Sequence, residues 1–149
     1  MAALAQQQKN IKNSELHATV LAEVFIMSKI VNAGKNQASK KTRSQELLNT
    51  VPDEKGFHFF TEYGKYTGVT ATSVVEFGEK LQTIPVESIT FHFQRDDFQK
   101  WLRNVIGDEE LAQRFDRVKE WPSWSSDENL RKELLKTVQM RIVELGEHP

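Results

Sequence analysis

The fold is decided by residues 57–118, which begin FHFFTEYGKYTGVTATS (57–73), continue through SITFHFQRDDF (88–98) and close on GDEELAQRFDRV (107–118). Aromatic residues dominate the first part, and Gly, Asp and Ser recur later at spacings typical of helix starts and stops. No Ser or Cys nucleophile sits in a recognisable catalytic turn. These signals indicate a folding module rather than a catalytic site.

The first element of this stretch is a predicted strand pair. Phe57, Phe59 and Phe60 favour a strand. Gly64 and Gly68 then bracket three residues in a hairpin or tight loop.

Helices are predicted after the strand pair, each opened by a capping residue. Ser73 with Glu76 is a capping box, Asp96 with Gln99 is a second, and Asp108 opens the helix after it. The helix after Ser73 has the apolar stripe Val74, Phe77 and Leu81, and the helix after Asp96 has Phe98, Trp101, Leu102, Val105 and Ile106. The helix after Asp108 has Leu111, Phe115 and Val118. The last helix, 127–145, has Leu130, Leu134, Val138, Ile142 and Leu145.

Residues 88–94 fit two structures. Ile89, Phe91 and Phe93 alternate as in a strand, whereas Ile89 and Phe93 also suit one turn of a helix. Helical segments on both sides favour a short helix.

A separate helix is predicted at about 14–33, with Ser14 as its cap and Gly34 as its stop. Its apolar face is too wide for one partner surface, so it packs in the protein's own core or docks on another copy or another protein. The candidate partner-binding residues are Val20, Val24, Phe25, Met27 and Val31, together with Trp121 and Trp124 of a later loop.

Residues 34–45 predict an exposed basic linker. Residues 1–50 hold seven Lys or Arg and only three Glu, although the whole chain has a formal net charge of −1. A solvated linker is one reading, and an arm that contacts nucleic-acid phosphates is the other. The candidate nucleic-acid contacts are Lys35, Lys40, Lys41 and Arg43.

Composition excludes several classes of protein. The absence of cysteine removes disulfides, thiolate catalysis and cysteine-ligated zinc, and it suits a reducing cytoplasm. The start, MAALAQQQKN, lacks the pattern of a signal peptide. The longest apolar stretch, 20–31, contains two charges and is shorter than the roughly 20 residues of a membrane span. We therefore expect a cytoplasmic protein with no membrane segment.

Several motifs in fixed order resemble an uncharacterised domain family of archaea and bacteria, a domain of unknown function. They are YTG (66–68), ATS (71–73), SITFHF (88–93), RDDF (95–98) and GDEELA (107–112). The resemblance covers residues 57–145 and leaves the N-terminal third unmatched. It implies a small, largely helical module, often attached to other domains, and no established chemistry. The family usually has Gly at the position of Asp96, a difference that predicts tighter helix capping here.

His92 is the most interesting single residue. Beside Arg95 and Asp97 its imidazole could act as a general base, or it could bridge two short helices through a hydrogen bond, which is the reading we favour. The candidate ligand-binding residues are Tyr63, Tyr66, His92, Arg95 and Asp97. Four histidines without metal-ligand spacing predict no metal site, and no cofactor or catalytic residue is expected.

The sequence thus predicts a mainly α (α+β) protein. An extension at 1–55 precedes a compact, mostly helical domain at 56–146 with a small strand pair at its start. The first functional hypothesis is a non-catalytic interaction or accessory module that docks on a larger assembly or on itself through the N-terminal helix. The alternatives are a nucleic-acid or ribonucleoprotein factor that uses the basic linker, and a small-ligand sensor or enzyme with a cleft near His92.

Overall fold

The computed structural model describes residues 39–40, 42–121 and 124–146. The chain divides into two units, Met1–Lys40 and Lys41–Pro149, and the second contains the compact domain. Outside the described residues lie the predicted helix at 14–33, its candidate contacts Val20, Val24, Phe25, Met27 and Val31, and the linker residues Lys35 and Lys41.

The second unit starts before residue 56. Residues 42–48 are helical, so residues 42–45 are not the irregular linker that their polarity predicted, although residues 42, 43 and 45 are exposed as expected. Leu47 is buried, and Arg43 of the same helix donates a hydrogen bond to the carbonyl of Gly107. The N–H of Val51 donates to the carbonyl of Thr72 (2.8 Å), and the short helix η1, Asp53–Lys55, leads into the first strand.

The strand pair is an antiparallel hairpin. Strand β1 spans Phe57–Glu62 and strand β2 spans Lys65–Ala71, and the register pairs Phe57 with Ala71. The register shifts twice along the hairpin. Gly68 has φ +81° inside β2, a conformation that a residue with a Cβ rarely adopts.

Helix α2, Val74–Thr83, begins with the predicted cap in a modified form. The Ser73 hydroxyl accepts the N–H of Glu76 (3.1 Å), as in a capping box. The Glu76 carboxylate, however, accepts the N–H and the hydroxyl of Thr72 (2.8 Å each) rather than the N–H of Ser73. These two bonds to Thr72 lower the pKa of Glu76.

Residues 88–94 are helical, as favoured, within helix α3, Val86–Gln94. Helix α4, Asp97–Trp101, continues into a wider π-helical turn, η2, Leu102–Ile106, which ends at Gly107.

Asp96 does not cap α4 with its side chain, so the prediction of tighter capping is wrong. Its φ of +60° places it in the left-handed region, which favours glycine, and its carboxylate turns to the Lys119 ammonium (2.6 Å) instead.

The last two helices are α5, Glu109–Glu120, and α6, Asp127–Gly146. Asp108 caps α5 as predicted and accepts the N–H of Leu111 (3.1 Å). The same buried carboxylate accepts two hydrogen bonds from the Arg141 guanidinium (2.9 and 3.0 Å). Asp108 therefore ties the start of α5 to the middle of α6.

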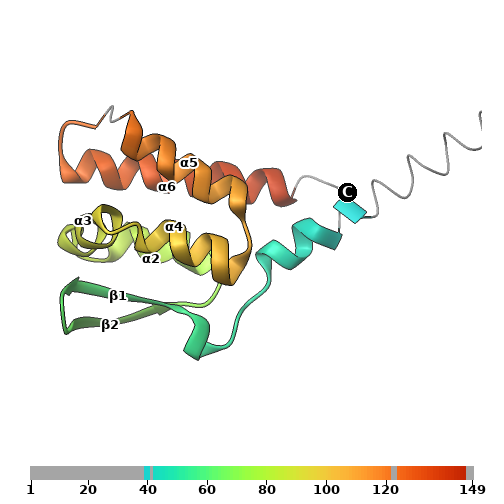
Figure 1. The fold of residues 1–149 in the computed structure, drawn as a ribbon, viewed down its shortest axis with the longest axis horizontal. Coiled ribbons are helices and arrows are strands. Elements are labelled where there is room, and N and C mark those ends of the chain that lie inside the picture. The colour runs from blue at the N-terminus through green and yellow to red at the C-terminus, as the bar shows by residue number, and fades with distance from the viewer. Residues whose placement is uncertain (1–38, 41, 122–123, 147–149) are drawn as a thin grey trace, which may run out of the picture. The chain divides into compact units, whose positions relative to one another are not determined.

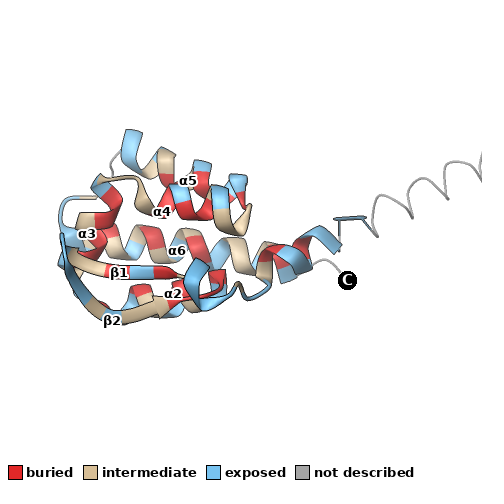
Figure 2. Cartoon of the chain, turned by 60° about the horizontal axis from the view of Figure 1, so that its bottom comes forward, coloured by how far each residue is buried: buried red, intermediate tan, exposed pale blue. Residues whose placement is uncertain are grey.

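Helices α2, α3 and α4 lie between the hairpin on one side and α5 and α6 on the other (Figure 1). All three layers contain buried residues (Figure 2). Phe57 packs the hairpin against the central helices, with its ring 5.8 Å from Phe77, 5.0 Å from Phe98 and 5.7 Å from Trp101. The predicted mainly α (α+β) class, with a strand pair at the start of the domain, is confirmed.

Substitutions at Asp96 test the strain at this position. We expect Asp96→Gly to be more stable than Asp96→Ala by about 1 kcal/mol, because both lose the Lys119 contact but only glycine adopts a positive φ without a Cβ penalty. Urea unfolding of the two variants measures the difference. An alanine variant as stable as the glycine variant would contradict the left-handed assignment.

Candidate functional site

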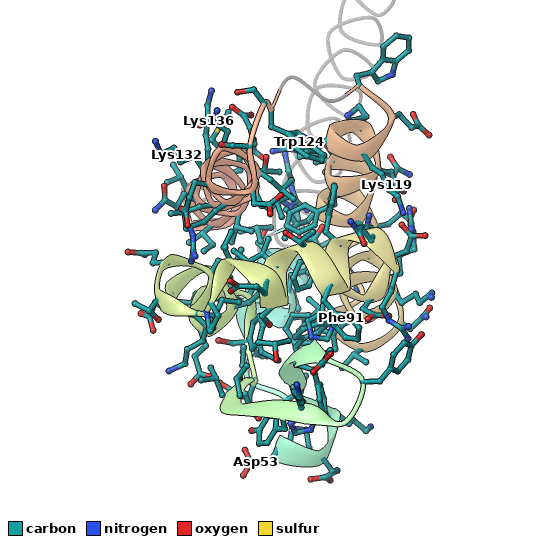
Figure 3. The ribbon with its side chains drawn as sticks, turned by 90° about the vertical axis from the view of Figure 1, so that its left-hand side faces the viewer. Asp53, Phe91, Lys119, Trp124, Lys132 and Lys136 are labelled. Atoms are coloured by element: carbon teal, nitrogen blue, oxygen red, sulfur yellow. The ribbon has the colours of Figure 1, made fainter. Side chains whose placement is uncertain are left out.

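A cavity of about 370 Å³ opens between the hairpin and the end of α3. Phe91 extends from α3 toward the hairpin at this place (Figure 3). The lining comes from β1, the hairpin turn, α3 and the start of α4, and comprises Phe57, His58, Phe60, Glu62, Tyr63, Gly64, Phe91, His92, Arg95 and Asp97. Aromatic rings form most of the wall.

His92 uses both ring nitrogens for internal hydrogen bonds. Nε2 accepts the N–H of Phe60 on β1 (2.8 Å), so the proton of the neutral ring resides on Nδ1. Nδ1–H then donates to the carboxylate of Asp97 (2.9 Å). Since neither nitrogen has a lone pair open to the cavity, this geometry favours the bridging role over the general-base role.

Burial lowers the pKa of His92, because the charged imidazolium would lose its hydration. The hydrogen bond to Asp97 acts in the opposite direction and is the smaller influence. The ring is therefore neutral at pH 7.

Asp97 joins His92 to Arg95. Its Oδ2 atom accepts from His92 and also from Nε of Arg95 (3.0 Å). This bond to Asp97 raises the pKa of Arg95, which is a permanent cation.

Arg95 lies over two aromatic rings, Tyr63 and Phe91, which are themselves in edge-to-face contact. The centre of its guanidinium lies 4.5 Å from the ring centroid of Tyr63 and 5.1 Å from that of Phe91. Its Nη1 also donates to the Tyr63 hydroxyl. Cation–π contacts of this kind fix a long side chain that would otherwise be mobile at the surface.

Four of the five candidate ligand residues come together at the cavity: Tyr63, His92, Arg95 and Asp97. Tyr66 is not among the lining residues, and its hydroxyl is hydrogen-bonded to that of Thr70 (2.7 Å). Sequence reasoning missed the aromatic walls Phe60 and Phe91, which belong to apolar patterns typical of a core. Phe60 directly follows Phe59, and neighbouring residues of a strand point to opposite faces. This was the only local sign in the sequence that one of these rings points away from the core.

The two loop tryptophans differ in their surroundings. Trp121 is 77% exposed. Trp124 packs its ring 6.4 Å from that of Phe93 and directs its indole N–H to the carbonyl of Val118 (3.4 Å). Trp121 is therefore the better placed of the two for contact with a partner.

The basic candidates in the described part of the chain are Lys40, which is exposed, and Arg43. Arg43 donates to the carbonyl of Gly107 (2.9 Å) and lies 3.6 Å from the carboxylate of Glu46. Its guanidinium is thus engaged within the domain, and the nucleic-acid role of this segment stays a prediction.

Within the described ranges, no group of three or more His, Cys, Asp or Glu side chains is arranged to hold a metal ion. The helices of that same part of the chain include none with the length and hydropathy to cross a bilayer.

The fold and the cavity define a small α+β domain with a hairpin-capped aromatic pocket. A model of the family of unknown function DUF5752 matches residues 13–139, and the chain belongs to this family. The match includes the predicted helix at 14–33, so the N-terminal third belongs to the family region from residue 13 onward and is not an unmatched extension. No curated protein and no solved structure matches the chain.

Variants of His92 test its bridging role. We expect His92→Phe to lower the free energy of unfolding by about 2 kcal/mol, because the Phe60 N–H loses its acceptor in a partly buried site. His92→Gln places an amide oxygen near the position of Nε2 and should cost about 1 kcal/mol. Urea unfolding gives both values, and a phenylalanine variant as stable as the wild type would rule the bridge out.

The pH dependence of stability gives a second test. The pKa of His92 is lower in the folded than in the unfolded chain, so the unfolded state takes up a proton first as the pH falls. The contribution of His92 to stability is complete above the unfolded pKa of about 6.5 and declines below it. We expect the free energy of unfolding to fall less steeply below pH 6.5 in His92→Gln than in the wild type. Equal slopes would contradict the lowered pKa.

Proposed function

We propose that this chain is a non-catalytic interaction module that docks on a larger assembly or on a second copy of itself. The observation that carries the proposal is the full engagement of His92, whose two nitrogens are bonded to Phe60 and Asp97. General acid–base catalysis needs a group that can exchange a proton with a bound substrate, and this imidazole is not available for it. The engagement of His92 supports a cavity that holds a group rather than one that transforms it.

Exposed apolar side chains support a docking role. Trp121 projects from the loop between α5 and α6, and Met140 and Val143 are half exposed on α6. A shallow, mostly apolar hollow of about 320 Å³ lies at Met140 and Val143, bordered by Gln139 and Glu144. Large apolar or aromatic side chains are the usual anchors of protein interfaces.

The N-terminal segment is the second element of the proposal. The wide apolar face predicted at 14–33 exceeds what one supporting surface covers, and the family match includes this segment. A helix with such a face is a typical docking element for a partner groove or for another helix.

Full-length protein with charges in the predicted helix tests the proposal. We expect wild-type chains to self-associate in light scattering, or to co-purify from native cells with one partner in fixed stoichiometry. The double substitution Val24→Glu and Met27→Glu should weaken that association at least about tenfold, because an apolar interface excludes an unpaired carboxylate.

Val75→Glu is the matched control, since Val75 is already 39% exposed on α2 and its substitution leaves the predicted helix intact. Retained association in this variant assigns the effect to the N-terminal segment. A wild-type chain that is monomeric and has no stoichiometric partner would refute the docking function.

A further inference from the structure

The cavity beside His92 has the properties of a small-molecule site. Its volume of about 370 Å³ falls at the lower end of the range for such sites, which are typically lined by apolar and aromatic side chains with a few polar groups. Phe57, Phe60 and Phe91 supply the apolar wall, and Arg95 supplies a cation at its edge. The ligand must therefore be small, with an apolar body.

Arg95, which lines the cavity, retains hydrogen-bonding capacity. Of its nitrogen atoms, Nε donates to Asp97 and Nη1 to Tyr63, whereas Nη2 makes no hydrogen bond to the residues that the structure describes. Guanidinium groups match carboxylates in geometry and bind them through two N–H groups. The rings of Tyr63 and Phe91 already fix the guanidinium, so little side-chain freedom remains to be lost on binding.

The charges around the cavity favour an anionic over a cationic ligand. Glu62 is paired with Lys65, and Asp97 is bonded to His92 and Arg95, so both carboxylates of the lining have partners. A ligand ammonium would meet the Arg95 cation at close range, where like charges are strongly unfavourable. Arg95 already lies over the rings of Tyr63 and Phe91, so the ring faces that it covers are not available to a second cation.

A neutral, wholly apolar ligand fits less well than one with an acceptor group. A body that covers the cavity would remove water from Nη2 of Arg95, and an N–H that loses its water without a new acceptor is costly. A carboxylate at that end of the ligand replaces the lost water.

We propose that the cavity of Phe57, Phe60, Phe91 and Arg95 binds a small monocarboxylate with an aromatic body, whose carboxylate pairs with the outer edge of the Arg95 guanidinium. The ring of the ligand stacks among the phenylalanine side chains. This site goes beyond the docking function and does not depend on it, because all of its residues lie in the hairpin, α3 and the start of α4.

The test uses the full-length chain and four probes that share parts of one structure: 3-phenylpropionate, its neutral amide, 3-phenylpropylamine and propionate. We expect titration by NMR to show 3-phenylpropionate binding at least about tenfold more tightly than the other three, with shifts at Phe60, Phe91 and Arg95. No binding of 3-phenylpropionate at about 10 mM, or tighter binding of the amine, would overturn the proposal.

Arg95→Gln should weaken 3-phenylpropionate binding at least about tenfold and leave the affinity for the amide nearly unchanged. Arg103→Gln is the matched control, because Arg103 is comparably exposed and pairs with Glu109 and Asp116 outside the cavity. Circular dichroism confirms that each variant is folded. Equal affinity for the carboxylate in wild type and Arg95→Gln would exclude the assigned contact, whatever the outcome of the docking experiments.

Discussion

The ring of His92, on α3, forms hydrogen bonds both to β1 and to the start of α4. Its Nε2 atom is bonded to the backbone of β1, the ring itself belongs to α3, and its Nδ1 atom is bonded to the residue that begins α4. Asp97 extends this line to Arg95, and Arg95 extends it to Tyr63 at the tip of the hairpin. Tyr63, His92, Arg95 and Asp97 all line the cavity. His92 is the buried member of this line, so its two nitrogens must keep their partners, because a buried donor or acceptor without one is costly.

The local part of the fold could be read from the sequence. Asp108 and Ser73 cap helices where the spacing of polar and apolar residues placed them, since a cap needs only its own helix. The buried positions Phe77, Phe98 and Phe115 follow from helical periodicity for the same reason.

Features that depend on distant residues could not be read in this way. The left-handed backbone of Asp96 is set by the tight junction between α3 and α4, and its side chain is drawn to Lys119, far along the chain. Phe91 is an apolar residue of the kind that usually fills a core, and it lines the cavity only because the hairpin lies opposite it. Of the candidate site, the sequence predicted the polar set Tyr63, His92, Arg95 and Asp97 and missed the aromatic wall.

The pair formed by Asp108 and Arg141 constrains how the domain folds while it is synthesised on the ribosome. Asp108 is 1% exposed, and 33 residues separate it from the arginine that neutralises it. A carboxylate without a partner is strongly disfavoured in such a place. While the chain is synthesised from its N-terminus, the start of α5 must therefore stay hydrated until α6 has emerged. The end of the C-terminal helix thus completes the domain, and a chain truncated before Arg141 would leave the Asp108 carboxylate without its arginine.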